Sequence, residues 1–224
     1  MNTFHVRQGW QEGAPLVPVG DTIDLLETGL GALAAFNGLM HENMTRNLGW
    51  TFLDMGRRMA RALAICDMML AVFGQAGGPE GDDTSLAFVL DVADSSMTYR
   101  ARYHQTPMLP LVLDLLLIDE TNPRSLAFQL AAMSAHVDQL PQGGAQAGRT
   151  GESRQLMTLL TQVRMAEIAR LAAAGTGGAR TALTGLLAGQ NQQLLDLSDA
   201  ISRRYFALVE KGPRWVRSGA RGPQ

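Results

Sequence analysis

Three arginines and one aspartate lie close together in the segment "LDMGRRMARAL", and their spacing could bind an anion. Asp54 lies three and four residues before Arg57 and Arg58, so on a helix its carboxylate can pair with either. Arg61 adds a third cation to the same side, and the charges do not cancel. Guanidinium groups keep their charge and grip carboxylate or phosphate through paired N–H groups. The cluster therefore needs either acids from other helices or an anionic ligand.

A second charged group, "DETNPRS", follows the apolar run "LVLDLLLI". Asp119 and Glu120 come just before Asn122, which with the following proline forms a cap and first-turn signature of a helix. A cation in that first turn is disfavoured by the helix dipole, so we expect Arg124 to have an acid or a ligand nearby. Asp114, if it is buried among the leucines, must find a hydrogen-bond donor.

Two further segments are rich in polar residues. They are "DSSMTYRARY", which begins at Asp94, and "SDAISRRYF", which lies near the end of the chain. Their spacing predicts that Asp94 and Arg102 lie on one face of a single helix, and Tyr99 among the arginines favours partial burial. Arg203 can pair with Asp199, four residues before it. A solvated face is the simpler interpretation of both segments.

The candidate polar cluster combines these groups with three residues just before the second helix, and our working hypothesis is that they converge at one end of the fold. Two interpretations stay open, a structural network that satisfies itself and a site for an anionic peptide or acyl phosphate. No residue is assigned a catalytic role. The members are Glu42, Asn43, Arg46, Asp54, Arg57, Arg58, Arg61, Asp94, Tyr99, Arg102, Asp119, Glu120, Asn122, Arg124 and Arg203.

Helices must position these residues, because apolar side chains recur at spacings of three and four and β-branched residues are few. We expect an all-α helical bundle of about six to seven helices. The domain should span residues 21–210, with an extended lead-in over 1–20, a flexible linker near 141–152 and a flexible basic tail over 211–224. The predicted helices cover about 21–40, 51–73, 83–103, 110–118, 122–140, 153–174 and 179–209.

Composition excludes several classes of function. A formal net charge of −2 gives no general attraction to nucleic acid or to an anionic membrane. Cys66 is the single cysteine, and no secretion signal or membrane-spanning run is visible, so we expect a cytoplasmic protein. Strict motifs for phosphate loops, zinc proteases, serine hydrolases and calcium loops are missing, and no metal or cofactor is expected.

Four segments together resemble the alpha-E family, a bacterial all-helical domain of unknown function, in the branch found beside circularly permuted ATP-grasp proteins. The resemblance covers roughly residues 33 to 206. The segments are "HENMTRNLGWTFLDMGRRMARAL", "VADSSMTYRARY", "LVLDLLLIDETNPRSLAFQLAAM" and "LSDAISRRYF".

The resemblance implies a role beside ATP-grasp and transglutaminase-like proteins in peptide synthesis or modification. Two departures stand out. Ala60 takes the place of the glutamate that usually precedes the arginine, here Arg61, in the family's Glu-Arg motif. The family's opening helix is missing, so the chain looks like the C-terminal portion of a longer member, and we expect a homodimer or a complex with another protein to cover exposed apolar surface.

Three functions remain possible at this point. The first is a helical accessory or partner domain of an ATP-grasp or transglutaminase-like system, without activity of its own. The second is an enzyme that binds an anionic peptide or acyl-phosphate substrate through the Arg and carboxylate cluster. The third is a purely structural bundle whose charges satisfy one another.

Overall fold

The computed structural model describes residues 18–74, 83–141 and 148–206. The chain divides into two compact units, Met1–Trp50 and Thr51–Gln224. Residues 1–17 of the expected lead-in are outside the described residues, and so is the whole of the expected basic tail. Much of the expected linker, residues 142–147, is also outside.

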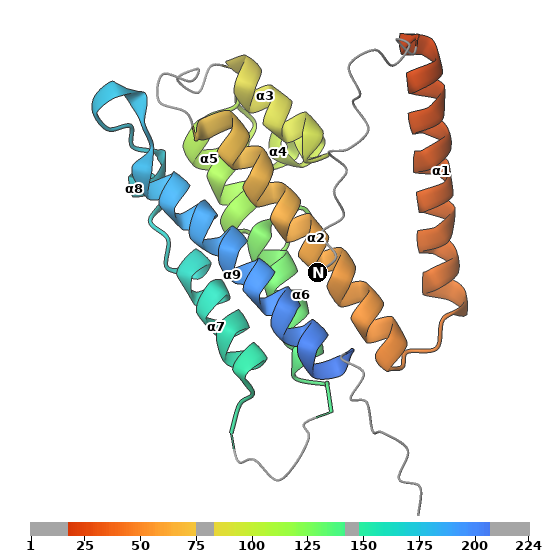
Figure 1. Cartoon of the computed structure of the whole chain (residues 1–224). Coiled ribbons are helices and arrows are strands. Elements are labelled where there is room, and N and C mark those ends of the chain that lie inside the picture. The colour runs from red at the N-terminus through yellow and green to blue at the C-terminus, as the bar shows by residue number, and fades with distance from the viewer. Residues whose placement is uncertain (1–17, 75–82, 142–147, 207–224) are drawn as a thin grey trace, which may run out of the picture. The chain divides into compact units, whose positions relative to one another are not determined.

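Every regular element of the described residues is helical, which confirms the all-α class (Figure 1). Two of the nine α-helices, α5 and α8, have only five residues each. No helix in these ranges is long and apolar enough to cross a membrane. The elements are α1 (Val19–Asn43), α2 (Leu48–Phe73), α3 (Asp83–Val92), α4 (Ser96–Tyr103), α5 (Leu109–Leu113), the π-helix η2 (Asp114–Ile118), α6 (Leu126–Val137), α7 (Gly151–Arg164), α8 (Ile168–Ala172), the 3-10 turn η3 (Thr176–Gly178) and α9 (Thr181–Tyr205).

Helix α1 belongs to the Met1–Trp50 unit and carries a row of large apolar side chains. Leu26, Leu30, Leu33 and Phe36 recur at spacings of three and four, as the sequence predicts for one helix face. Each of these side chains is more than half exposed. The apolar row is therefore a feature of α1 that the described part of its own unit leaves uncovered.

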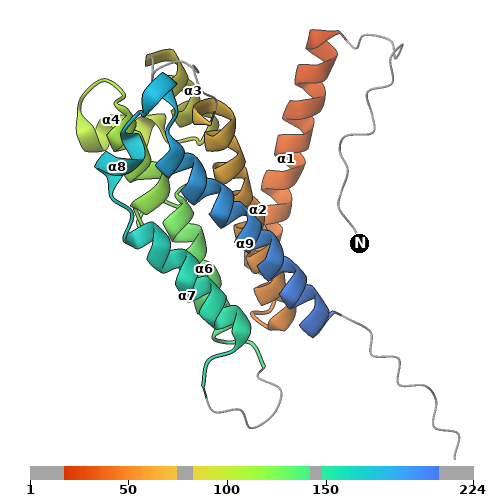
Figure 2. The ribbon, with the colours of Figure 1, turned by 60° about the vertical axis from the view of Figure 1, so that its left-hand side comes forward.

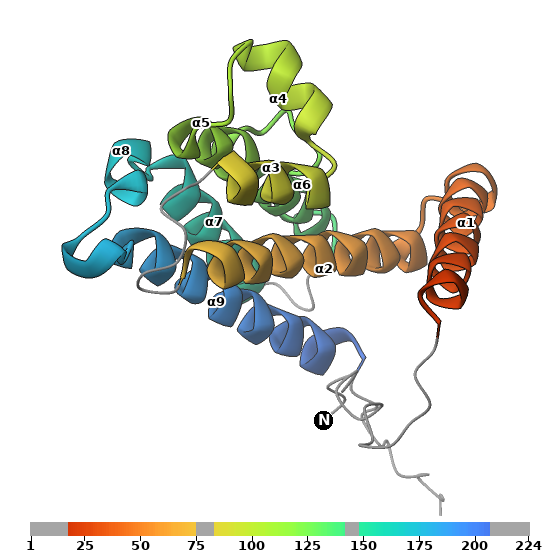
Figure 3. The same ribbon diagram turned by 90° about the horizontal axis from the view of Figure 1, so that it is seen from above.

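In the Thr51–Gln224 unit, α6 packs against α7, and α9 packs against both α7 and α8 (Figure 2). Helix α2 runs between α3 and α9 when the unit is seen from above (Figure 3). Polar contacts tie α2 to its neighbours, since Asp54 meets His136 of α6 and Asp67 accepts a hydrogen bond from Asn191 of α9. Leucine and methionine side chains fill the core between these helices.

Two helices that the sequence predicts to be continuous are broken. The expected helix over 83–103 separates into α3 and α4 at Asp94, whose φ of +48° lies in the left-handed region. Aspartate tolerates this conformation, and the adjoining serines favour turns over helix interiors. The prediction that Asp94 and Arg102 share one helical face is therefore wrong. The expected helix over 153–174 likewise separates into α7 and α8.

The start of α6 also differs from the expectation. Ser125 is the N-cap, because its Oγ accepts a hydrogen bond from the N–H of Phe128 at 3.0 Å. Asn122 instead lies in the preceding loop, where its Oδ1 accepts from the N–H of Arg124 at 3.0 Å. The segment that begins with Asp119 is thus a polar loop between η2 and α6 rather than the first turn of a helix.

Candidate functional site

Asp54 of α2 is the centre of a buried polar network. The side chain is 2% exposed, and its Oδ2 lies 2.8 Å from Nε2 of His136 and 3.2 Å from Nε of Arg58. Arg57 Nη1 lies 3.7 Å from the other carboxylate oxygen. Burial alone would raise the pKa of Asp54, but the bond to His136 and the charges of Arg58 and Arg57 outweigh it and hold this pKa below its ordinary value.

Gln129 connects this network to the loop before α6. Its Oε1 accepts a hydrogen bond from Arg58 Nη1 at 3.4 Å, and its Nε2 donates to the carbonyl of Pro123. Asn122 fixes the same loop from the other side, because its Nδ2 donates to the carbonyl of Leu115 at 3.0 Å. The side chains of Gln129 and Asn122 are both buried. The loop is therefore held by amide groups whose main role is to satisfy backbone atoms.

Asp119 is the second buried carboxylate and joins α4 to the loop. Its Oδ2 pairs with Arg102, and its Oδ1 accepts from the N–H and the hydroxyl of Thr121 at 2.9 and 2.7 Å. Burial would raise the pKa of Asp119, yet the two bonds from Thr121 and the charge of Arg102 bring it below the ordinary value. Three donors thus satisfy the Asp119 carboxylate. A fourth donor, the Ser125 hydroxyl, satisfies the backbone carbonyl of Asp119.

Two further ion pairs of the loop lie at the surface. Arg124 Nη2 lies 2.6 Å from Asp94 Oδ2, and both side chains are well exposed. Glu120 accepts two hydrogen bonds from Arg164 of α7, at 2.6 and 2.8 Å. The Arg164 bond lowers the pKa of Glu120. Solvent screens such pairs, so they contribute little to stability.

Arg61 differs from the other α2 arginines of the cluster. It is half-buried, and no hydrogen bond or ion pair to another described residue involves its guanidinium. Burial is the main cause that lowers the pKa of Arg61, and the charges of Arg57, Arg124 and Arg58 add to it, while the charge of Asp54 acts in the opposite direction without outweighing them. A cation is thus held close to other cations without a carboxylate of its own.

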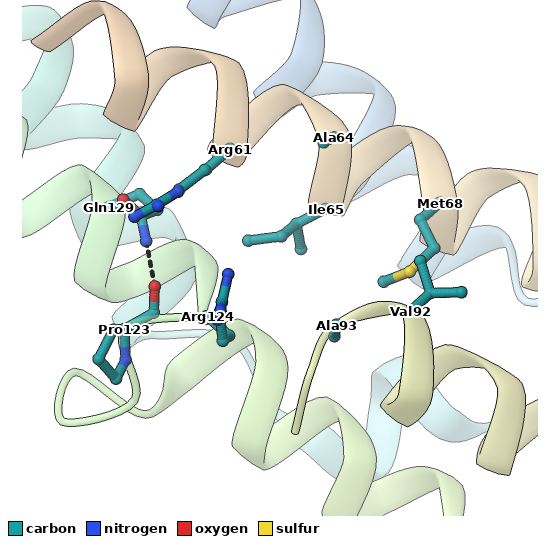
Figure 4. Close-up of a pocket in the computed structure, with 9 residues that line it drawn as sticks. All are labelled: Arg61, Ala64, Ile65, Met68, Val92, Ala93, Pro123, Arg124 and Gln129. Carbon is teal, nitrogen blue, oxygen red and sulfur yellow. Dashed lines mark hydrogen bonds between the residues drawn. The ribbon is translucent and has the colours of Figure 1, made fainter. Parts of the chain in front are cut away.

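Arg61 lines a cavity of about 150 Å³ between α2, the end of α3 and the loop before α6. Figure 4 shows the Arg61 and Arg124 side chains near Gln129 and Pro123, with the apolar Ile65, Met68, Val92 and Ala93 toward the other end. We call this cavity the Arg61 pocket. Its lining is Arg61, Ala64, Ile65, Met68, Val92, Ala93, Pro123, Arg124 and Gln129.

Asp114 and the tyrosines of α4 form a separate group. The hydroxyl of Tyr103 donates to Asp114 Oδ2, which supplies the donor that the sequence requires for this acid. Burial and that bond raise the pKa of Tyr103. Tyr99 is 1% exposed and its hydroxyl bonds the carbonyl of Thr106 and the N–H of Met108, each at 3.0 Å. Tyr99 therefore holds the loop after α4 and takes no part in the pocket.

The remaining predicted residues belong to the other unit or to α9. Glu42, Asn43 and Arg46 belong to the Met1–Trp50 unit, where Arg46 donates to the carbonyl of His41 and lies over the Trp50 ring. Arg203 is exposed on α9. Convergence therefore holds for the segments that include Asp54–Arg61, Asp94, Arg102 and Asp119–Arg124, and the loop before α6 is the element that they share.

Sequence reasoning missed two central residues, His136 and Gln129. Both lie on α6, where their neighbours are apolar and predicted a simple core helix. His136 meets a carboxylate 82 positions away, and no local spacing reports such a contact. The polar interruption of an apolar helix face by Gln129, which is fully buried, was the one available signal.

A metal site is not supported in the described part of the chain, where no three His, Cys, Asp or Glu side chains are grouped to hold an ion. The pocket lining offers guanidinium and amide donors and apolar walls, and it includes no carboxylate, thiol, hydroxyl or imidazole. These groups can bind and orient an anion. They offer no nucleophile or general base to a bound molecule.

Comparison with known families matches residues 4–206 to alpha-E, described as a predicted alpha-helical domain with a conserved ER motif. The chain belongs to the alpha-E family. Uncharacterized proteins of Mycobacterium bovis and of two Mycobacterium tuberculosis strains are 28% identical to this alpha-E chain over 179 residues. That stretch is 80% of this chain but 20% of each relative, so the match spans a fifth of their length. No solved structure matches.

The structure shows where the two residues at the position of the alpha-E motif lie. The sequence contains no Glu-Arg pair, and Ala60-Arg61 stands at the place that the resemblance assigns to it. Ala60 lines a groove between α2 and α9 with Met59 and Ile201, whereas Arg61 lines the Arg61 pocket. Consecutive helical residues point about 100° apart, so the two positions of the motif serve different surfaces.

Proposed function

We propose that this alpha-E domain is an accessory domain, without catalysis of its own, that holds an anionic group in the Arg61 pocket. The observation that carries the proposal is the half-buried guanidinium of Arg61, which has no carboxylate partner among the described residues. Keeping a cation beside other cations costs free energy, and an anionic ligand offsets that cost. The pocket lining supports binding and supplies no group that would react.

The partner in this proposal is an ATP-grasp ligase or a transglutaminase-like protein that makes or modifies peptides. The family resemblance supports this pairing through the association of alpha-E domains with such proteins. The much greater length of the mycobacterial relatives supports a domain that works beside other domains. Carboxylates and acyl phosphates are the reacting groups of ligation chemistry, and both are anions that guanidinium groups recognise.

The exposed apolar row of α1 supports the further proposal that the chain works in a complex. Leu26, Leu30 and Leu33 are each more than 60% exposed. An apolar surface of this kind marks an interaction site more often than a free surface. We propose that the complex is with the ligase partner, and self-association is the alternative that the experiment must separate.

Affinity capture tests the accessory role. The tagged full chain is captured from the cells that produce it, the bound proteins are identified by mass spectrometry, and light scattering gives the mass of the purified chain. Recovery of an ATP-grasp or transglutaminase-like protein, and a change in its ATP- or peptide-dependent turnover when the chain is added back, is the expected result. Turnover of peptide or acyl phosphate by the chain alone would contradict it and favour the enzyme interpretation. A chain that recovers neither protein would also contradict it.

A further inference from the structure

The Arg61 pocket has a cationic end and an apolar end. Arg61 lies beside Gln129, the end of Arg124 lies between Arg61 and the apolar side chains, and Ile65 and Met68 lie farther along α2 (Figure 4). A ligand that fills such a space has an anionic group at one end and an apolar group at the other. Inorganic anions would satisfy only the cationic end and would leave the apolar walls wet.

The size of the pocket limits the ligand. A volume of about 150 Å³ matches that of an engineered cavity known to hold benzene, which means room for roughly six non-hydrogen atoms. Cavities for whole drug-sized ligands are at least about 300 Å³. The pocket therefore takes a single small group, either a small molecule or the end of a longer one, and it is too small for a nucleotide.

The charges around the pocket favour a ligand with one negative charge. Arg61 and Arg124 contribute two cations to the lining, and Asp94 pairs with Arg124 at 2.6 Å, which leaves one charge of the lining itself without compensation. Asp54 is already engaged with His136, Arg58 and Arg57. A carboxylate matches this single excess charge and the two-pronged geometry of a guanidinium.

Phosphate fits less well because the lining residues Pro123, Arg124 and Gln129 offer no free backbone N–H. Phosphate sites commonly use the free N–H groups at the start of a helix. At the start of α6, the N–H of Phe128 is taken by Ser125 Oγ and the N–H of Gln129 by the Ser125 carbonyl. The N–H of Arg124 is taken by Asn122 Oδ1. The donors that remain for a ligand are mainly guanidinium groups.

From these features we infer that the Arg61 pocket binds the carboxylate of a small aliphatic residue, such as the C-terminal residue of a peptide. The guanidinium of Arg61 holds the carboxylate, Arg124 supports it from the loop, and Ile65, Met68 and Val92 contact the aliphatic side chain. This inference rests on the proposed function and names the class of ligand that the accessory domain would carry.

An NMR titration of the full chain tests the inference at constant ionic strength. The probes are N-acetylvaline, its uncharged amide N-acetylvalinamide, and inorganic phosphate. We expect saturable shifts with N-acetylvaline and binding about tenfold weaker or worse for the amide, since the amide cannot accept a charged hydrogen bond pair from the guanidinium. Arg61→Gln should weaken N-acetylvaline binding by a similar factor. Arg203→Gln, which changes an exposed arginine outside the pocket, should leave it unchanged.

The other outcomes separate the inference from the proposed function. Phosphate binding that is tighter than N-acetylvaline binding and lost in Arg61→Gln would overturn the carboxylate inference but keep an anion pocket. Equal binding of the acid and the amide would overturn the inference as well. If no probe saturates the wild type, both the inference and the anion-holding role are wrong. The spectrum of Arg61→Gln without ligand verifies that a loss of binding in this variant does not come from unfolding.

Discussion

Helix α2 carries two charged residues about two turns apart, Asp54 and Arg61, and their charges are compensated in different ways. Asp54 is buried with His136, Arg58 and Arg57 around one carboxylate. Arg61 is half-buried in a pocket beside Arg124, and its charge is left without a carboxylate in the described residues. The carboxylate of the region around Asp54 is paired within the chain, although its Oδ1 accepts no hydrogen bond from a described residue and has only Arg57 Nη1 at 3.7 Å. We propose that a ligand completes the region around Arg61.

The contrast shows how a charged residue that stabilises the fold can be distinguished from one that binds a ligand. Buried ion pairs are poor evidence of function when the carboxylate finds its cations within the fold, because the network then explains its own retention. A cation kept near other cations has no such explanation. Partner geometry, rather than the number of charged residues on a helix, therefore separates Asp54 from Arg61.

The largest expected effect comes from opening the closed region. Asp54→Ala leaves the half-buried Arg58 and His136 without their carboxylate, which is itself 2% exposed. Losing one member of a buried ion pair costs up to about 3–5 kcal/mol of unfolding free energy. Urea denaturation at neutral pH measures this loss. Asp199→Ala is the control, since Asp199 is exposed on α9, and it should change stability by no more than about 0.5 kcal/mol. Similar losses for both variants would mean that the network contributes no special stability.

A smaller loss is expected when a half-buried acid loses its donor. Tyr103→Phe keeps the ring but removes the hydroxyl that donates to Asp114, and an unsatisfied acceptor costs up to about 1–3 kcal/mol. Tyr205→Phe is a matched control, because that hydroxyl makes only a long bond of 3.4 Å to Pro141 at an exposed position. Thermal unfolding of the two variants should show a clear drop for the first alone. Equal melting temperatures would mean that the bond from Tyr103 to Asp114 contributes no stability.

The closed carboxylates also predict how stability depends on pH. The pKa of Asp119 lies below its ordinary value of 3.8 in the fold, so the unfolded chain takes up the proton first as the pH falls. The stabilisation is complete above that value and is lost as the pH drops from there toward the lower folded pKa. Asp119→Asn should be less stable than the wild type at neutral pH, and the difference should shrink in acid. Urea midpoints at a series of pH values would show parallel curves if this assignment were wrong.

The smallest effect concerns the motif position beside Arg61. Ala60→Glu restores the family's Glu-Arg pair and places a carboxylate three residues after Arg57 on the exposed side of α2. Pairs at this spacing contribute about 0.2–0.5 kcal/mol, and adjacent helical residues do not face each other. We expect a slight gain in stability and unchanged binding at the Arg61 pocket, measured by the same NMR titration. Loss of binding would show that residue 60 acts on the pocket after all.

The sequence predicted the apolar side of α2 well, because its periodicity is local. Met55, Met59, Ala62 and Cys66 are buried as the spacing requires. The break at Asp94 escaped prediction because a left-handed φ at a residue other than glycine has no strict signal. The cap of α6 was placed at Asn122 instead of Ser125, since both residues are good caps and only the fold decides between them.

Most residues of the candidate site could be predicted from the sequence, but the pairs that they form could not. The arginines and acids were identified from their spacing along each helix, but the pairs that matter join residues far apart in the chain. Arg102 meets Asp119, Arg124 meets Asp94, and Asp54 meets His136 across 82 positions. Which arginine lacks a partner is a property of the assembled fold, so Arg61 could not be singled out from the sequence.

The most direct test of the contrast is urea unfolding of the wild type and Arg61→Gln at constant ionic strength, with sodium chloride or with sodium N-acetylvaline. A ligand that binds only the folded chain raises the unfolding free energy by an amount set by its concentration and affinity. We expect the two proteins to be within about 0.5 kcal/mol of each other in chloride, and N-acetylvaline to stabilise the wild type but not Arg61→Gln. A large loss for Arg61→Gln in chloride, with no response of the wild type to N-acetylvaline, would contradict it and make Arg61 a structural residue like Asp54.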